Sequence, residues 1–135
     1  METARNLCLV LEKKADLGRE IRLAYSQEDK ETLQEIANIK IPVLLQRLQD
    51  FYQSFRTQWN LENKSFGFEV QTVRIGGLLQ RLKDVQEILN AYLREEIPGI
   101  AELNEPQKAF HYFEQNEIRS LNYNLWTDIV SPSKI

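Results

Sequence analysis

The first candidates for a ligand-binding motif in this sequence are its glycines. Three of the chain's five glycines, Gly67, Gly76 and Gly77, fall within residues 63–84, whose flanks are typical of strong helix. Adjacent glycines can cradle a phosphate, but such loops follow a strand and have GxGxxG spacing or end in GK[ST], and IGGLLQ does neither. The pattern favours a structural role, in which Gly76 and Gly77 let another backbone approach closely. A small-molecule site at the pair is the alternative.

Thiol, imidazole and carboxylate groups form no recognisable constellation in the sequence. Cys8 lies in the apolar run LCLVL and is typical of a small buried residue, and the one histidine is far away along the chain. The carboxylate pairs Glu28–Asp29 and Glu95–Glu96 are expected in a loop and near a helix end, facing solvent. Neither a calcium-binding loop nor a GxSxG elbow is present. We therefore expect no catalytic residue, no metal and no cofactor.

Length, charge and hydropathy limit the partners. The 135 residues suit one domain, and a net charge of -3 gives no electrostatic reason to expect nucleic acid or an anionic membrane. No apolar run approaches the roughly 20 residues that span a bilayer, and no signal peptide is visible. A single cysteine permits no internal disulfide and is consistent with a reducing compartment. We expect a cytoplasmic protein.

The apolar spacing predicts an all-α fold, an antiparallel helical hairpin or bundle of about four helices. Proline disfavours helical geometry in the residue before it, so a break is expected at Ile41, ahead of Pro42. Pro98 and Gly99 are expected to end the last long helix. The four predicted helices span residues 3–25, 30–39, 42–62 and 67–97.

The sequence divides into a helical bundle domain, residues 1–105, and a C-terminal tail, residues 106–135. The tail has aromatic residues without clean periodicity, so a short helix or irregular segment is expected. Trp126, Ile129 and Val130 are too apolar for a free tail. We expect the tail to dock on the bundle or on a domain outside this sequence.

The turn NKSFG joins the two long helices, with Gly67 as the hinge. An aromatic stripe precedes it, and at helical spacing such a stripe is typical of a core. Trp59 differs from the rest of the stripe because it lies at the helix end, beside polar Asn63 and Lys64.

Several stretches together resemble the helical C-terminal domain of a subgroup of glycoside hydrolase family 20 enzymes, which are exo-acting β-N-acetylhexosaminidases. The resemblance is clearest over residues 14–97, and the tail NLWTDIVSPSKI is similar more weakly. Its core pattern is a tryptophan, then ENKxFGFEV, R-[IL]-GG-L and RL. This sequence carries the pattern at Trp59, Glu62, Asn63, Lys64, Phe66, Gly67, Phe68, Glu69, Val70, Arg74, Ile75, Gly76, Gly77, Leu78, Arg81 and Leu82.

The resemblance implies that the catalytic machinery lies outside this chain. Such enzymes use an adjacent Asp-Glu pair in a TIM barrel, where the Glu is the general acid and the substrate's own acetamido group is the nucleophile. This sequence has no Asp-Glu dipeptide and is too short for a barrel. It departs from the subgroup at Glu28, where a glycine is usual, and at Pro98, where an unbroken helix is expected.

The resemblance therefore implies a non-catalytic accessory domain that supports the barrel of the same parent chain and could form a homodimer contact. Candidate contacts with a parent site or interface are Trp59, Asn63, Lys64, Phe66 and Arg74. In the alternative interpretation, Trp59 packs on Gly67 and Arg74 pairs with a local carboxylate. A freestanding helical interaction or scaffold module, with no enzymatic parent, is the alternative function.

Overall fold

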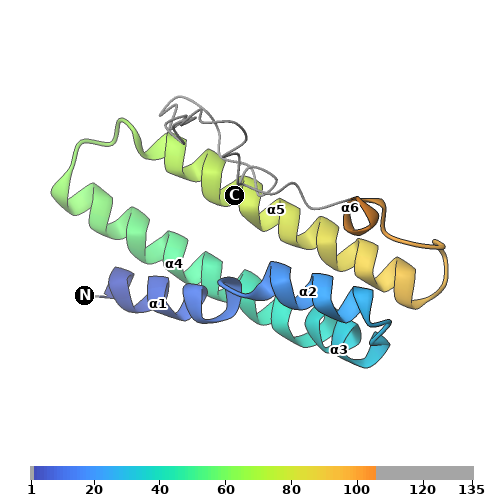
Figure 1. Ribbon diagram of the computed structural model, residues 1–135. Helices are drawn as coiled ribbons and strands as arrows, with labels where there is room; N and C mark the ends of the chain where they lie inside the picture. Colours follow the sequence, from blue (N-terminus) through green and yellow to red (C-terminus); the bar gives the residue numbers. More distant parts are fainter. Residues whose placement is uncertain (1, 106–135) are drawn as a thin grey trace, which may run out of the picture.

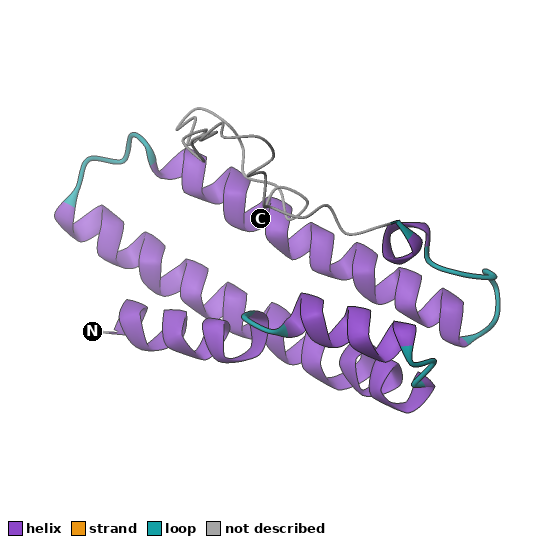
Figure 2. Ribbon diagram, viewed as in Figure 1, coloured by secondary structure: helices purple, strands orange, loops and turns teal. Residues whose placement is uncertain are grey.

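The computed structural model describes residues 2–105 and confirms the all-α prediction. Within that range every regular element is helical (Figure 2). The elements in chain order are α1 (Glu2–Lys14), α2 (Leu17–Ser26), α3 (Lys30–Glu35), the π-helical turn η1 (Ile36–Lys40), α4 (Ile41–Glu62), α5 (Phe68–Leu93) and α6 (Ala101–Asn104). The predicted tail, residues 106–135, lies outside the described residues.

The long helices α4 and α5 form an antiparallel hairpin, α1 packs along α4, and α2 packs on α3 (Figure 1). At one end of the hairpin, which we call the base, α2, α3 and η1 pack against the start of α4 and the end of α5. The opposite end, which we call the tip, comprises the Asn63–Gly67 loop and the helix turns around it, from Tyr52 to Thr72. The largest fully buried side chains lie at the base, and they are Leu33, Ile36, Ile41, Leu44 and Leu89.

The predicted helix over residues 3–25 is wrong, because two helices separated by a turn at Ala15 and Asp16 occupy that range. Aspartate and glycine have low helix propensity, and Asp16 lies in this turn while Gly18 lies in the first turn of α2. The turn allows α1 to pack on α4 while α2 packs on α3. The expected burial of Cys8 is also wrong, since its thiol is exposed and Val10 faces the core instead.

The predicted break at Ile41 does not occur. Helical geometry continues from α3 through η1 into α4, and Ile41 has φ -64° and ψ -48°. The π turn accommodates the proline, because the N–H of Ile41 bonds to the carbonyl of Ile36, five residues earlier. Pro42 has no N–H to offer the carbonyl of Ala37. The side chain of Gln86, on α5, donates a hydrogen bond to that carbonyl at 2.7 Å.

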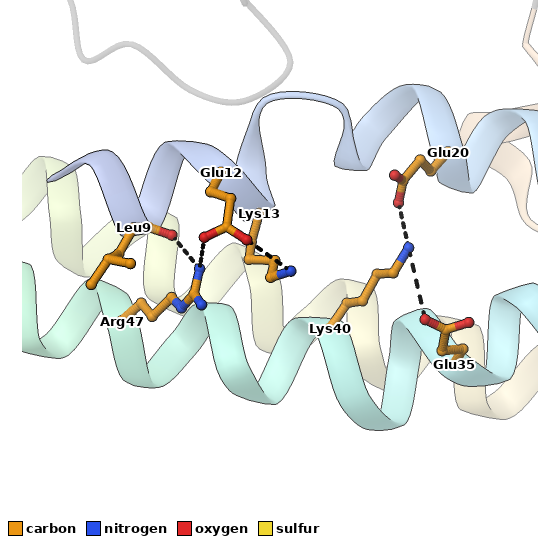
Figure 3. A network of polar contacts seen from close by, with 7 residues as sticks. All are labelled: Leu9, Glu12, Lys13, Glu20, Glu35, Lys40 and Arg47. Atoms are coloured by element: carbon orange, nitrogen blue, oxygen red, sulfur yellow. Dashed lines mark hydrogen bonds and ion pairs between the residues drawn. The ribbon is translucent and has the colours of Figure 1, made fainter. Parts of the chain in front are cut away.

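Polar contacts hold the first two helices against the hairpin (Figure 3). The Nη1 of Arg47, on α4, donates to the backbone carbonyl of Leu9 at 2.7 Å and to the carboxylate of Glu12 at 2.9 Å. The ammonium of Lys40 lies 3.0 Å from the carboxylate of Glu20 and 3.9 Å from that of Glu35. The contacts of Arg47 link α1 to α4, and those of Lys40 link α2 to η1 and α3.

Two helices at the base end in residues with left-handed backbone geometry. After α5, Glu95 has φ 60°, and the N–H of Glu96 reaches back to the carbonyl of Ala91 at 2.9 Å. This is a Schellman motif, whose left-handed position is most often glycine. It ends α5 at Leu93, four residues before the predicted end at residue 97. Glu28, with φ 55°, occupies the same position after α2.

Candidate functional site

The tip of the hairpin carries a cluster of aromatic rings contributed by both long helices. Tyr52, Phe55 and Trp59 follow one face of α4, and Phe68 enters from the first turn of α5. The ring centroid of Phe68 lies 5.6 Å from that of Tyr52, 5.5 Å from Phe55 and 5.8 Å from Trp59. Such separations fall in the attractive range for aromatic pairs. The cluster joins the ends of α4 and α5.

Trp59 is fixed in place by the turn that follows it. Its indole Nε1 donates to the backbone carbonyl of Lys64 at 2.9 Å. Gly67 has φ +97°, and a Cβ added there would lie 3.4 Å from Cζ2 of Trp59. The carboxylate of Glu69 accepts the Gly67 N–H at 2.7 Å, which caps the start of α5. Trp59 therefore packs on Gly67, as the alternative interpretation expected, and Gly67 is the hinge between α4 and α5.

The loop residues present a surface to solvent rather than to the domain itself. Asn63, Lys64 and Phe66 are exposed, and Phe66 keeps 87% of its surface accessible. Leu61, on the last turn of α4, is 82% exposed and was missed in the sequence, where it reads as one more apolar helix residue. Large apolar side chains held on a short, internally bonded turn are suited to enter a pocket in another protein surface.

Arg74 does not share this surface. It is half-buried on α5, roughly 10 Å along the helix axis from Gly67 at 1.5 Å per residue. The structure thus brings together Trp59, Asn63, Lys64 and Phe66 at the tip and leaves Arg74 about two helical turns away.

The close backbone approach predicted at Gly76 and Gly77 does not occur among residues 2–105. Both glycines are exposed, and a Cβ added at either would meet no described atom within 4 Å. The prediction treated the pair as part of the buried stripe, whereas the core of α5 is formed by Phe68, Leu82 and Leu89. Each glycine weakens a helix by about 1 kcal/mol relative to alanine, so the contacts described within the bundle do not account for the pair.

Within residues 2–105, no group of three His, Cys, Asp or Glu residues is placed to hold a metal ion. Displaced pKa values belong to exposed ion pairs and caps. Hydrogen bonding from Lys30, together with its charge, holds the pKa of Glu95 below its usual value, and Arg94 does the same to Glu96. At the tip, exposed apolar side chains are held on an internally bonded turn.

None of the helices in the described range is both long and apolar enough to cross a bilayer.

Comparison with protein families matches the chain, over residues 1–122, to the family described as the Glycoside Hydrolase 20C C-terminal domain. A search of curated proteins gives no match. The family match extends the resemblance seen in residues 14–97 to the N-terminus and through part of the tail.

Proposed function

The chain belongs to the glycoside hydrolase 20C C-terminal domain family, and from this membership we propose that it is the helical accessory domain of a β-N-acetylhexosaminidase. The parent enzyme would remove terminal β-linked N-acetylhexosamine with a barrel domain outside this sequence. The match over residues 1–122 is the observation that carries the proposal. We place the enzyme in the cytoplasm, since a single cysteine permits no internal disulfide.

In this proposal the tip is the surface that meets the rest of the enzyme, either the barrel of the same chain or that of a second copy in a homodimer. Phe66 and Leu61 are more than four-fifths exposed, although the turn between them is fixed by the Trp59–Lys64 hydrogen bond. A contact surface that is ordered before binding loses less conformational entropy on association than a flexible one. Trp59 supports this surface from below, since its ring packs on Phe68 and Gly67.

The test replaces the exposed side chain and leaves its support intact. In the parent enzyme, Phe66→Ser should lower activity on a chromogenic β-N-acetylglucosaminide or weaken dimerisation in sedimentation, without changing the stability of the helical domain. Gln49→Ser is the matched control, because Gln49 is exposed on α4 outside the tip. If the two variants match the unaltered enzyme in activity, stability and association, the tip is not a contact surface.

A second test addresses the accessory role itself. The isolated chain should show no hydrolysis of the same substrate, and the reading frame that contains it should encode a barrel with an adjacent Asp-Glu pair. Hydrolysis by the isolated chain would overturn the non-catalytic role. A reading frame without any hydrolase domain would favour the freestanding interaction module.

A further inference from the structure

One face of α5 stays exposed although it is apolar. Val70 is 46% exposed and Val73 is 54% exposed, and Gly77 follows at helical spacing on the same side. At 100° per residue, Arg81 falls on this face as well, one turn beyond Gly77. We call the stretch from Val70 to Gly77 the open face of α5. It points away from the buried residues Leu82 and Leu89.

The chain itself begins to cover this side of α5. The guanidinium of Arg81 pairs with the carboxylate of Glu102, on α6. The Tyr25 hydroxyl fixes α6, because it accepts the N–H of Ile100 at 3.0 Å and bonds to the side chain of Asn104 at 3.1 Å. The described part of the chain thus ends at Glu105, beside α5 and close to the open face.

We propose that residues 106–122 of the same chain dock on the open face of α5, and that Gly76 and Gly77 are glycine because this segment passes close to them. The family match ends at residue 122, so these residues belong to the same family unit as the described helices. Their sequence is rich in large apolar side chains, namely Phe110, Tyr112, Phe113, Ile118 and Leu121.

The distances allow this placement. Val70 lies about 16 Å along the helix axis from Arg81 at 1.5 Å per residue. Residues 106–122 would extend about 25 Å even as a helix, and further if less compact. The segment starts within reach of Arg81, so it can pass Gly77 and Val73 without a long connection. A covered open face would also explain why two glycines occur in a helix where no described atom approaches them.

The proposal is tested in the full chain by paramagnetic relaxation. A nitroxide is attached at Gln80→Cys, an exposed position beside the open face, in a Cys8→Ser background. The amide signals of residues 106–122 should be broadened, with at least a twofold intensity loss. A label on native Cys8, which lies on α1, should leave them unchanged and is the matched control.

A mixed sample, which contains isotope-labelled chain without nitroxide and unlabelled chain with nitroxide, distinguishes docking within one chain from docking by a second copy. Broadening of residues 106–122 in the mixed sample can come only from a second copy and would overturn the proposal, as would an absence of broadening in the first sample. Gly77→Leu should abolish the broadening by filling the gap, whereas Gly18→Ala, at an exposed helix position with free space, should retain it. The experiment uses the isolated chain, so its outcome is independent of the proposed glycosidase role.

Discussion

The two ends of the hairpin differ in which side chains they bury. At the base, Leu33, Ile36 and Ile41 are removed from solvent by neighbours within the same chain. At the tip, aromatic rings stack between α4 and α5, while Phe66 and Leu61 remain more than four-fifths exposed. The base buries its aliphatic side chains within the same chain and so needs no partner to cover them. The tip is ordered by its own turn and still presents apolar surface to solvent. The base stabilises the domain, and the tip is where a partner would add burial.

The largest expected effect contrasts one leucine from each end. Leu44→Ala at the base should lower the free energy of unfolding by about 3 kcal/mol, through lost burial and the cavity left behind. Leu61→Ala at the tip should change it by less than about 0.5 kcal/mol, because the side chain is mostly in solvent. Urea unfolding followed by circular dichroism measures both. Equal losses at the two positions would remove the distinction between base and tip.

The π turn at the base gives the next largest effect. Gln86→Leu leaves the Ala37 carbonyl without its donor and should cost about 2 kcal/mol. In a Pro42→Ala background the penalty should be smaller by on the order of 1 kcal/mol, since residue 42 then carries an N–H of its own. A double-mutant cycle in urea measures this coupling. The same penalty in both backgrounds would show that Gln86 stabilises the base through some other contact.

The tip depends on one backbone conformation. Gly67→Ala should cost about 1–2 kcal/mol, because an L-residue resists φ near +97°. Space alone does not set the cost, as the added Cβ would meet Trp59 at an ordinary contact distance of 3.4 Å. Gly18→Ala, at an exposed position of α2 with nothing within 4 Å of an added Cβ, should be neutral or stabilising by up to about 1 kcal/mol. Thermal unfolding of both variants makes the comparison, and a neutral Gly67→Ala would contradict it.

Sequence periodicity was sufficient for the fold class and for the long hairpin, because α4 and α5 carry sustained apolar stripes. It failed where tertiary contacts override local preference. Pro42 predicts a break only if its neighbours are α-helical, and the sequence does not reveal that Gln86, on another helix, compensates for the missing N–H. The turn at Asp16 was equally hidden, since Val10 and Leu17 keep helical spacing across it.

The candidate site was predictable in part. The polar and aromatic residues around NKSFG indicated the tip, and Gly67 indicated the hinge. The presence of Gly76 and Gly77 among apolar residues did not reveal which side of α5 the two glycines occupy. Gly76 and Gly77 fall between the half-buried residues Ile75 and Leu78 in sequence, yet they lie on the exposed side. Exposed Leu61 could not be told from a core residue, since apolar type alone does not report burial.

At the base, one residue other than glycine occupies a left-handed backbone conformation that favours glycine. Glu28 has φ 55°, in a position where the resembling subgroup usually has glycine. Glu28→Gly should therefore raise the free energy of unfolding by about 1 kcal/mol, the reverse of the change expected for Gly67→Ala at the tip. Glu31→Gly, inside α3, is the matched control and should cost about 1 kcal/mol. Chemical denaturation of the two variants compares them, and a loss at Glu28 would mean that its side chain makes an essential contact.

The smallest expected effect is a loss of stability at low pH. It arises at the base of the hairpin, from protonation of Asp29. The Asp29 carboxylate caps α3 by accepting the Thr32 N–H at 3.0 Å and the Thr32 hydroxyl at 2.7 Å. The hydroxyl bond and then the backbone bond lower its pKa below the ordinary 3.8. A carboxylate with a lowered pKa in the folded state stabilises above the pKa of the unfolded chain, and this stability is lost as pH falls through the folded pKa.

Asp29→Asn tests this acid sensitivity because an asparagine cap keeps its acceptor oxygen at every pH. The unfolding midpoint of the unaltered chain should fall faster than that of Asp29→Asn as pH drops from about 5 to 2, so the two curves converge or cross in acid. Asp29→Ala lacks the acceptor and should lie below Asp29→Asn throughout. Parallel curves for the unaltered chain and Asp29→Asn would show that protonation of Asp29 does not weaken the base, and its acid sensitivity would then have to come from ion pairs such as Lys30–Glu95.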